Sequence, residues 1–266
     1  MTATPTAYET IRYEVVDDVA TLTMHRPERR NAMTNTMVRE TYEALTVAAA
    51  DPSLRVLVLT GSGTSFCPGA DLQWVADGDS ASDRLNPEPF RIPALLHEMP
   101  AVTIAAVNGA CAGAALGWAC ACDLRIAAAS ARFNTAFLDV GVAGDMALPW
   151  SLPRLLGASK ARDLMFLPDK FDAAQAHRIG LVARVIDDVD AGAFTTAVQE
   201  LVTRLTAFSP AALRTLKQNF LDAEHQSLSD FALVEAERHI GLFRLDDTRE
   251  AFAARVEKRP PRFTGH

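Results

Sequence analysis

Two glycine turns, each placed between a β-rich apolar run and an Ala/Leu-rich segment, most constrain how this chain can fold. The first is Phe66-Cys67-Pro68-Gly69-Ala70-Asp71-Leu72, which follows the apolar residues 56–60. The second runs from Asn108 to Gly117 and follows residues 102–107. A strand that turns on glycine into a helix aims main-chain N–H groups at one point, where they can hold a phosphate or a developing oxyanion.

The alternation of strands and helices predicts an α/β fold with a largely parallel sheet. Strands are expected at residues 11–16, 19–25, 55–61, 102–108, 123–128 and 181–186, and helices at 34–50 and 114–121. After residue 145 helices dominate, with amphipathic segments expected at 191–208, 210–223, 228–240 and 247–258. Such a helical C-terminal third serves either as a lid or as a packing module for oligomerisation.

Composition excludes several classes of function. The net charge of -7 argues against nucleic acid as a partner, because phosphate binding needs a basic face. No apolar stretch approaches the ~20 residues of a membrane span. The four cysteines form no CxxC pair and have no adjacent histidine, so we expect buried packing residues, no metal site and a reducing cytoplasm.

The order and spacing of several motifs resemble the crotonase, or enoyl-CoA hydratase/isomerase, superfamily over residues 13–265. Besides the two turns, the resemblance is carried by His25-Arg26-Pro27 with Asn31-Ala32-Met33, residues 122–127, Leu152-Pro153-Arg154-Leu155-Leu156-Gly157, residues 176–182 and residues 257–265.

The resemblance implies an α/β spiral of repeated ββα units with a helical C-terminal trimerisation region. Residues 1–195 would form the core with the CoA and active site, and residues 196–266 the oligomerisation region. The expected assembly is a homotrimer or a dimer of trimers. The expected ligand is an acyl-CoA thioester, whose CoA is part of the substrate, so that no separate cofactor is needed.

The resemblance also assigns roles within the site. The N–H groups of Ala70 and Ala114 would hold the thioester oxygen, whereas Pro68 has no N–H to donate. Adenine would lie against the backbone from Pro68 to Leu72, which includes Asp71, although Asp71 also suits a helix cap. Two further groups of residues are candidates for substrate binding. Arg29 and Arg30 would lie near the CoA phosphates, and the acyl channel would be lined by Leu72, Trp74, Phe90 and Phe137. The aromatic residues among them could equally be part of the hydrophobic core.

Carboxylates decide the reaction in this family. Hydratases use two glutamates, which fall here on Gly117 and Phe137, so the standard hydration mechanism is not available. Asp145 falls where several relatives with other chemistry place an aspartate, and its apolar neighbours should raise its pKa. The alternative is that Asp145 caps the helix expected at residues 147–156. Asp139 is expected at the rim.

A double-bond isomerisation through an enolate, with Asp145 as proton carrier, is therefore the leading hypothesis for the activity. An atypical hydratase and a non-catalytic acyl-CoA-binding subunit are the alternatives. Dehalogenation is disfavoured because the tryptophan and histidine that assist it correspond to Phe137 and Phe90.

Overall fold

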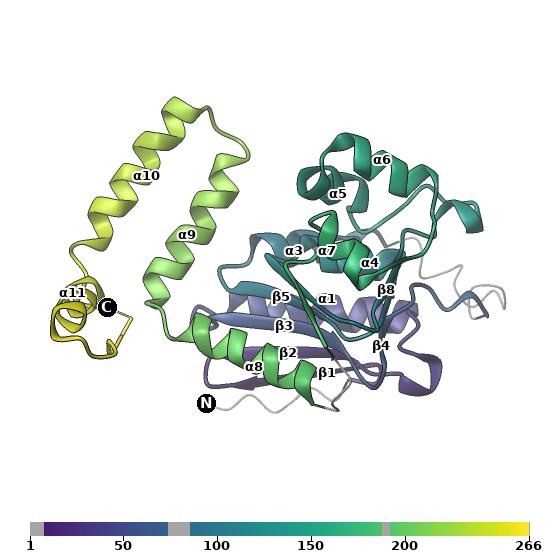
Figure 1. The fold of residues 1–266 in the computed structure, drawn as a ribbon, viewed down its shortest axis with the longest axis horizontal. Helices are drawn as coiled ribbons and strands as arrows, with labels where there is room; N and C mark the ends of the chain where they lie inside the picture. Colours follow the sequence, from purple (N-terminus) through teal and green to yellow (C-terminus); the bar gives the residue numbers. More distant parts are fainter. Residues whose placement is uncertain (1–7, 74–85, 188–191, 266) are drawn as a thin grey trace.

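The computed structural model describes residues 8–73, 86–187 and 192–265 (Figure 1). Trp74, expected in the acyl channel, lies outside these ranges.

The larger sheet carries the strands that the sequence predicts. Its order is β1-β2-β3-β5-β7-β10, in which β1 is antiparallel to β2 and the other neighbours are parallel. The strands are β1 (Ile11–Val16), β2 (Val19–Met24), β3 (Val56–Gly61), β5 (Val102–Val107), β7 (Leu124–Ala128) and β10 (Arg184–Ile186). The predicted α/β class with a largely parallel sheet is confirmed.

A second, smaller sheet was not predicted. It consists of β4 (Ser65–Cys67), β6 (Ala110–Ala112), β8 (Arg132–Asn134) and β9 (Phe171–Asp172), in that order. Glycines let the chain pass from one sheet to the other: a Cβ on Gly61 would overlap the carbonyl oxygen of Ser65, and one on Gly109 that of Thr64. The unit β5-β6-α4, with α4 at Ala114–Ala121, is one of the ββα units implied by the resemblance.

The two faces of the larger sheet have separate cores. Leu57 and Leu59 of β3 belong to the main core, which includes residues of α1 (Asn35–Ala50), α3 (Ile92–Glu98) and α4. Val56 and Val58 point the other way and pack with Leu201 of α8 (Ala193–Thr206). This alternation is the period-two pattern of a strand buried on both faces.

Several shorter helices connect the longer elements, and only the α-helices among them contribute buried residues. They are the 3-10 helices η1 (Pro27–Arg29), η3 (Glu88–Arg91) and η4 (Leu138–Val140), and the α-helices α5 (Leu148–Leu156), α6 (Ala158–Phe166) and α7 (Ala173–Arg178). The helices α5 and α6 lie together at the top of Figure 1, and α5 also packs against α4.

The last three helices extend away from the two sheets (Figure 1). They are α9 (Pro210–Ala223), α10 (Leu228–Leu242) and α11 (Asp246–Glu257). Large apolar side chains on them are exposed, among them Phe220, Leu233 and Phe252. The predicted boundary between residues 195 and 196 falls inside α8, and the division into two functional regions stays a prediction.

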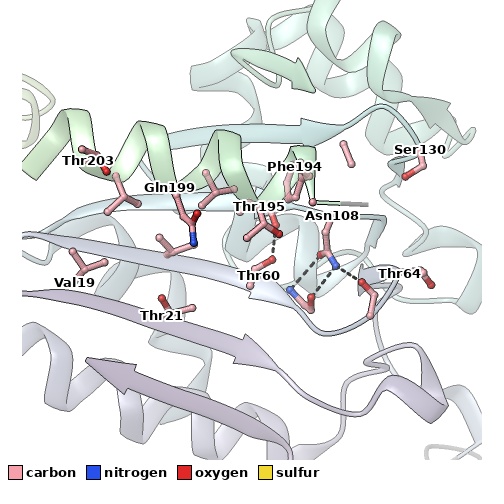
Figure 2. A pocket seen from close by; sticks show the side chains of 18 residues that line it. Val19, Thr21, Thr60, Thr64, Asn108, Ser130, Phe194, Thr195, Gln199 and Thr203 are labelled. Carbon is pink, nitrogen blue, oxygen red and sulfur yellow. Dashed lines mark hydrogen bonds between the residues drawn. The ribbon is translucent and has the colours of Figure 1, made fainter. Parts of the chain in front are cut away.

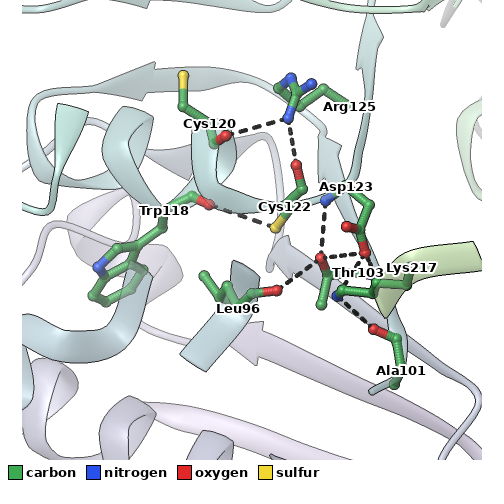
Figure 3. A network of polar contacts seen from close by, with 9 residues as sticks. All are labelled: Leu96, Ala101, Thr103, Trp118, Cys120, Cys122, Asp123, Arg125 and Lys217. Carbon is green, nitrogen blue, oxygen red and sulfur yellow. Dashed lines mark hydrogen bonds and ion pairs between the residues drawn. The ribbon is translucent and has the colours of Figure 1, made fainter. Parts of the chain in front are cut away.

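An ion pair between the buried Lys217 and the half-buried Asp123 ties α9 to the core. Lys217 Nζ donates to Asp123 Oδ2 and to the carbonyl of Ala101, each at 2.8 Å (Figure 3). The same carboxylate oxygen accepts the N–H of Thr103 at 2.7 Å. A buried ammonium group needs such partners, because removing it from water is otherwise strongly unfavourable. This network therefore fixes the start of the C-terminal helices relative to the sheet.

Candidate active site

The structure brings the two glycine turns together. The parallel pairing of β4 with β6 sets Ser65 beside Ala110 and Cys67 beside Cys111. Beyond these strands, a Cβ added to Gly69 would lie 3.1 Å from the carbonyl oxygen of Ala112 and 3.9 Å from Cα of Gly113. Gly69 and Gly113 both have positive φ, at 99° and 55°, which glycine adopts without strain.

Each turn presents a main-chain donor that the protein does not use. Among the described residues, no acceptor receives the N–H of Ala70 or of Ala114. Ala114 is the first residue of α4, where N–H groups have no partner within the helix. Ala114 is buried and Ala70 is exposed. The pair is thus equipped to bind an oxygen that carries negative charge.

Polar contacts hold the first turn in place. The N–H of Asp71 donates to the carbonyl of Met33 at 2.9 Å, and the N–H of Met33 donates to the carbonyl of Gly69 at 2.8 Å. The buried Asp71 carboxylate pairs with Arg26 at 3.2 Å. Asp71 therefore anchors its own turn, and its contact with a substrate stays a prediction.

Asn31, which the sequence singled out only as part of a motif, holds the loop before the first turn in place. Its fully buried amide donates to the carbonyls of Ser62 and Ser65 at 2.9 and 2.7 Å and accepts the N–H of Arg26 at 2.9 Å. It thereby joins the 26–33 loop to the segment that enters β4. A buried, shape-matched set of hydrogen bonds of this kind gives no signal in a single sequence.

Arg29 and Arg30, expected near the CoA phosphates, lie near the first turn, whereas Leu72 and Phe90 were expected along the acyl channel. Arg29 and Arg30 are exposed on and after η1, and Arg29 Nη1 is 3.5 Å from Oε1 of Gln73. Pro68 is half-buried, and Leu72 is exposed. Phe90, on η3, is exposed as well. Their contacts with a substrate stay predictions.

Phe137 lies between the second turn and the loop that carries Asp145. A Cβ added to Gly113 would lie 4.0 Å from Cε1 of the Phe137 ring. A Cβ added to Gly144 would lie 3.8 Å from Cδ2 of the same ring. The ring is buried. A phenylalanine here fills space between the donor turn and the carboxylate loop and cannot transfer a proton.

Asp145 is half-buried, and its Oδ1 is buried without a partner among the described residues. Burial raises the pKa of this carboxyl to about 6. The helix-cap alternative is wrong: the residue that precedes α5 is Ala147, in left-handed conformation, and no side chain caps that helix. Asp139, on η4, is exposed.

The Asp145 loop leaves no room for a side chain at Gly117, the residue where the resemblance places one hydratase glutamate. A Cβ on Gly117 would lie 2.5 Å from the carbonyl oxygen of Met146 and 2.8 Å from Met146 Cβ. Atoms this close would overlap, so a side chain at residue 117 does not fit beside this loop.

The cysteines show no sign of reactivity. All four are buried free thiols. Burial raises the pKa of Cys67, Cys120 and Cys122 to about 12 and that of Cys111 well above its ordinary value. In the described part of the chain, no three histidine, cysteine or acidic residues gather as metal ligands would.

A cavity of about 830 Å³ lies on the other side of the sheet from α4, beneath α8 (Figure 2). It is lined by Val58 and Thr60 of β3 and by Gln199 and Thr203 of α8, and none of the predicted site residues lines it. Asn108, also at its edge, donates to the carbonyls of Gly61 and Gly63 at 2.8 and 2.9 Å. Asn108 thus braces the strand ends that lead into both turns.

No helix in residues 8–73, 86–187 or 192–265 has the length and apolar character needed to cross a membrane.

Comparisons with known proteins show similarity over nearly the whole chain. A sequence model described as enoyl-CoA hydratase/isomerase matches residues 14–266. A probable enoyl-CoA hydratase of Rhodobacter capsulatus is 36% identical over 97% of this chain and 99% of its own length. The 1,2-epoxyphenylacetyl-CoA isomerase of Escherichia coli K12 is 34% identical over 97% of this chain and 99% of its own length. The crystal structure of an enoyl-CoA hydratase from Bacillus anthracis superposes with a TM-score of 0.88 at 26% identity, covering 97% of this chain and all of that one.

Proposed function

Because the chain belongs to the enoyl-CoA hydratase/isomerase family, we propose that it binds an acyl-CoA thioester and moves a double bond in the acyl group, with Asp145 as the proton carrier. Two features together carry the proposal. The N–H groups of Ala70 and Ala114 have no acceptor among the described residues, and burial raises the pKa of the half-buried Asp145 carboxyl to about 6.

The reaction needs only a proton to move. The Asp145 carboxylate removes a proton from a carbon next to the double bond, and the electrons pass to the thioester oxygen. The N–H groups of Ala70 and Ala114 stabilise the resulting dienolate, each donor contributing a few kcal/mol. Protonated Asp145 then returns the proton to the carbon at the other end of the dienolate, which regenerates the carboxylate. A carboxyl with a pKa near 6 suits both steps at neutral pH.

In this proposal the other predicted residues bind the substrate. Arg29 and Arg30 are exposed close to the first turn, where they can reach the phosphates of CoA. Phe137 supplies a buried apolar wall beside the acyl group. No separate cofactor enters the reaction, because the step involves neither oxidation nor group transfer.

Isomerisation is favoured over hydration by the side chains at two positions. Hydration needs one group to activate water and another to supply a proton, and neither Gly117 nor Phe137 does this. The E. coli relative is named as a 1,2-epoxyphenylacetyl-CoA isomerase, which supports an isomerisation but not the movement of a double bond in particular. Hydration stays the second candidate because the R. capsulatus relative is named as a hydratase.

The test is to incubate the purified protein with 2-enoyl-CoA and 3-enoyl-CoA thioesters in heavy water and to follow isomerisation and deuterium incorporation. Wild type should catalyse both, and Asp145→Asn should lose at least about 100-fold in kcat. Asp139→Asn, which changes an exposed carboxylate on η4, is the matched control. A full rate in Asp145→Asn would remove that residue from the mechanism.

Two further outcomes would select the alternatives. Rapid addition of water to crotonyl-CoA by wild type would establish the hydratase. Tight binding of CoA thioesters without turnover across a broad panel, and with an affinity that Asp145→Asn leaves unchanged, would establish a non-catalytic binding protein.

We also propose that the chain self-associates as a homotrimer or a dimer of trimers. The support is the exposed apolar surface on α9, α10 and α11, including Phe220, Leu233 and Phe252. Surface of this kind is typical of a protein interface. Light scattering after size exclusion should give three or six times the 28.7 kDa chain mass; a monomer at micromolar concentration would contradict the proposal.

A further inference from the structure

At Gly117, α4 and the Asp145 loop approach each other too closely for a side chain. A Cβ added there would lie 2.5 Å from the carbonyl oxygen, 2.8 Å from Cβ and 3.2 Å from the carbonyl carbon of Met146. All three atoms belong to the residue that follows Asp145, and two of them are backbone atoms. The space beside Gly117 is therefore taken by the Met146 peptide, and a side chain at residue 117 requires that peptide to move.

The loop has an unusual backbone at this point. Met146 and Ala147 are consecutive non-glycine residues with positive φ, at 47° and 54°. Left-handed conformation costs about 1–2 kcal/mol for such residues. It persists only where surrounding packing holds it in place. Met146 is buried, and Leu148 at the start of α5 is fully buried, so packing against the core supplies that support.

We propose that Gly117 is a positioning residue, whose lack of a side chain admits the Met146 peptide against α4 and thereby sets the Asp145 carboxyl in the site. This inference rests on the proposed function, because it gives Gly117 its effect through the proton carrier. A side chain at residue 117 and the present Asp145 loop then exclude each other. A glutamate side chain at residue 117 would compete for space with the Met146 peptide, which follows Asp145 and holds its loop in place.

A purely structural glycine is the competing interpretation, and Gly241 provides the comparison. Gly241 lies inside α10, and a Cβ there would meet no atom within 4 Å. Replacing a glycine inside a helix by alanine removes a penalty of up to about 1 kcal/mol, and less at Gly241, the second-last residue of α10. Any further difference between the two variants therefore comes from the contact with Met146.

Gly117→Ala should lower kcat for isomerisation by about 10- to 100-fold with KM changed less than about threefold, since a displaced catalytic group affects the chemical step. A loop pushed off α4 exposes Asp145 to water, so the acid limb of the kcat profile should move from about pH 6 toward pH 4. Gly241→Ala should leave kcat and the acid limb as in wild type. An unchanged acid limb in a folded, active Gly117→Ala protein would overturn the proposal.

A second variant keeps the test decisive if the alanine variant folds poorly. Gly117→Ala combined with Met146→Gly removes the 2.8 Å contact and the left-handed strain at residue 146, but it retains the 2.5 Å contact with the carbonyl oxygen. We expect its acid limb to stay shifted. Recovery of the wild-type profile would show that the Met146 side chain, not the peptide, determines the position of Asp145, and would refute the proposal as stated.

Two measurements separate this inference from the proposed function. Lack of isomerisation by wild type would refute the proposed function alone. The contribution of Asp145 to the pH dependence of unfolding can be measured without any enzymatic activity. This contribution should shrink in the Gly117→Ala background and persist in the Gly241→Ala background.

The Gly117→Glu variant tests whether the two kinds of chemistry exclude each other. It should show neither hydration nor isomerisation. A variant that hydrates crotonyl-CoA while it retains isomerisation would contradict this exclusion.

Discussion

Asp145→Asn should make the protein more stable at neutral pH while it abolishes catalysis. The reason is that the wild-type carboxyl is held where its charged form is disfavoured: Oδ1 is buried without a partner among the described residues, and burial raises the pKa to about 6. In the unfolded chain the same carboxyl titrates near its ordinary value of 3.8. Between these two values the folded protein binds more protons than the unfolded chain, so its stability falls as pH rises.

The size of the effect follows from the two pKa values. The difference between about 6 and 3.8, at about 1.4 kcal/mol per pH unit, gives on the order of 3 kcal/mol as an upper limit. The carboxyl is only half-buried, so water reduces the penalty, and burial of the asparagine amide offsets part of the gain. We therefore expect Asp145→Asn to be about 1–2 kcal/mol more stable than wild type above pH 6 and equal to it below pH 3.8.

The assay is urea unfolding of both proteins at one protein concentration, at intervals from pH 3.5 to pH 8. The stability difference should grow between pH 4 and pH 6 and stay constant above. Asp139→Asn controls for the loss of one surface charge, because Asp139 is exposed. A difference that does not depend on pH, or a wild type that is the more stable protein at pH 7, would refute the reasoning.

Three further predictions test the donors, the C-terminal anchor and the strained loop. Ala114→Pro removes one N–H at the first position of a helix, where proline is tolerated, and should lower kcat about 10²- to 10³-fold with little change in KM, measured by steady-state kinetics. Lys217→Met should lower the free energy of unfolding by about 2–4 kcal/mol, whereas Lys160→Met, from an exposed pair, should change it by less than about 0.5 kcal/mol. Ala147→Gly should leave stability unchanged or raise it by up to about 1 kcal/mol in the same unfolding assay, because glycine adopts the left-handed conformation freely.

The long elements of the fold were predictable because each carries a clear period. The helices expected at residues 114–121 and 210–223 have those same bounds in the structure. The four strands of the smaller sheet were missed because each has only two or three residues, too few to show alternation. Their presence is signalled instead by Gly61 and Gly109, where the backbones approach too closely for any side chain.

The candidate site was predictable where the main chain determines it and not where loops do. The strand–glycine–helix order predicts main-chain donors in both turns, and the family resemblance assigns them to Ala70 and Ala114. Neither N–H group has an acceptor among the described residues, and their contact with a thioester stays a prediction. The alternative that Asp145 caps α5 was wrong because the helix begins two residues later than a cap requires, after two left-handed residues. Left-handed conformation at Met146 and Ala147 is set by tertiary packing, which local sequence does not encode.

Gly117 shows how the same residue changes meaning between sequence and structure. In the sequence it is the place where a catalytic glutamate is missing, which only removes a reaction from consideration. In the structure it is the place where α4 and the Met146 peptide meet, one residue from the carboxyl that the proposed reaction uses. A change from glutamate to glycine at this position thus has two linked effects. It removes one proton-transfer group, the glutamate, and it opens the space that the loop carrying Asp145 requires. If that linkage is correct, the two kinds of chemistry cannot be combined in one site by adding a glutamate, since the peptide that places Asp145 must leave to admit it.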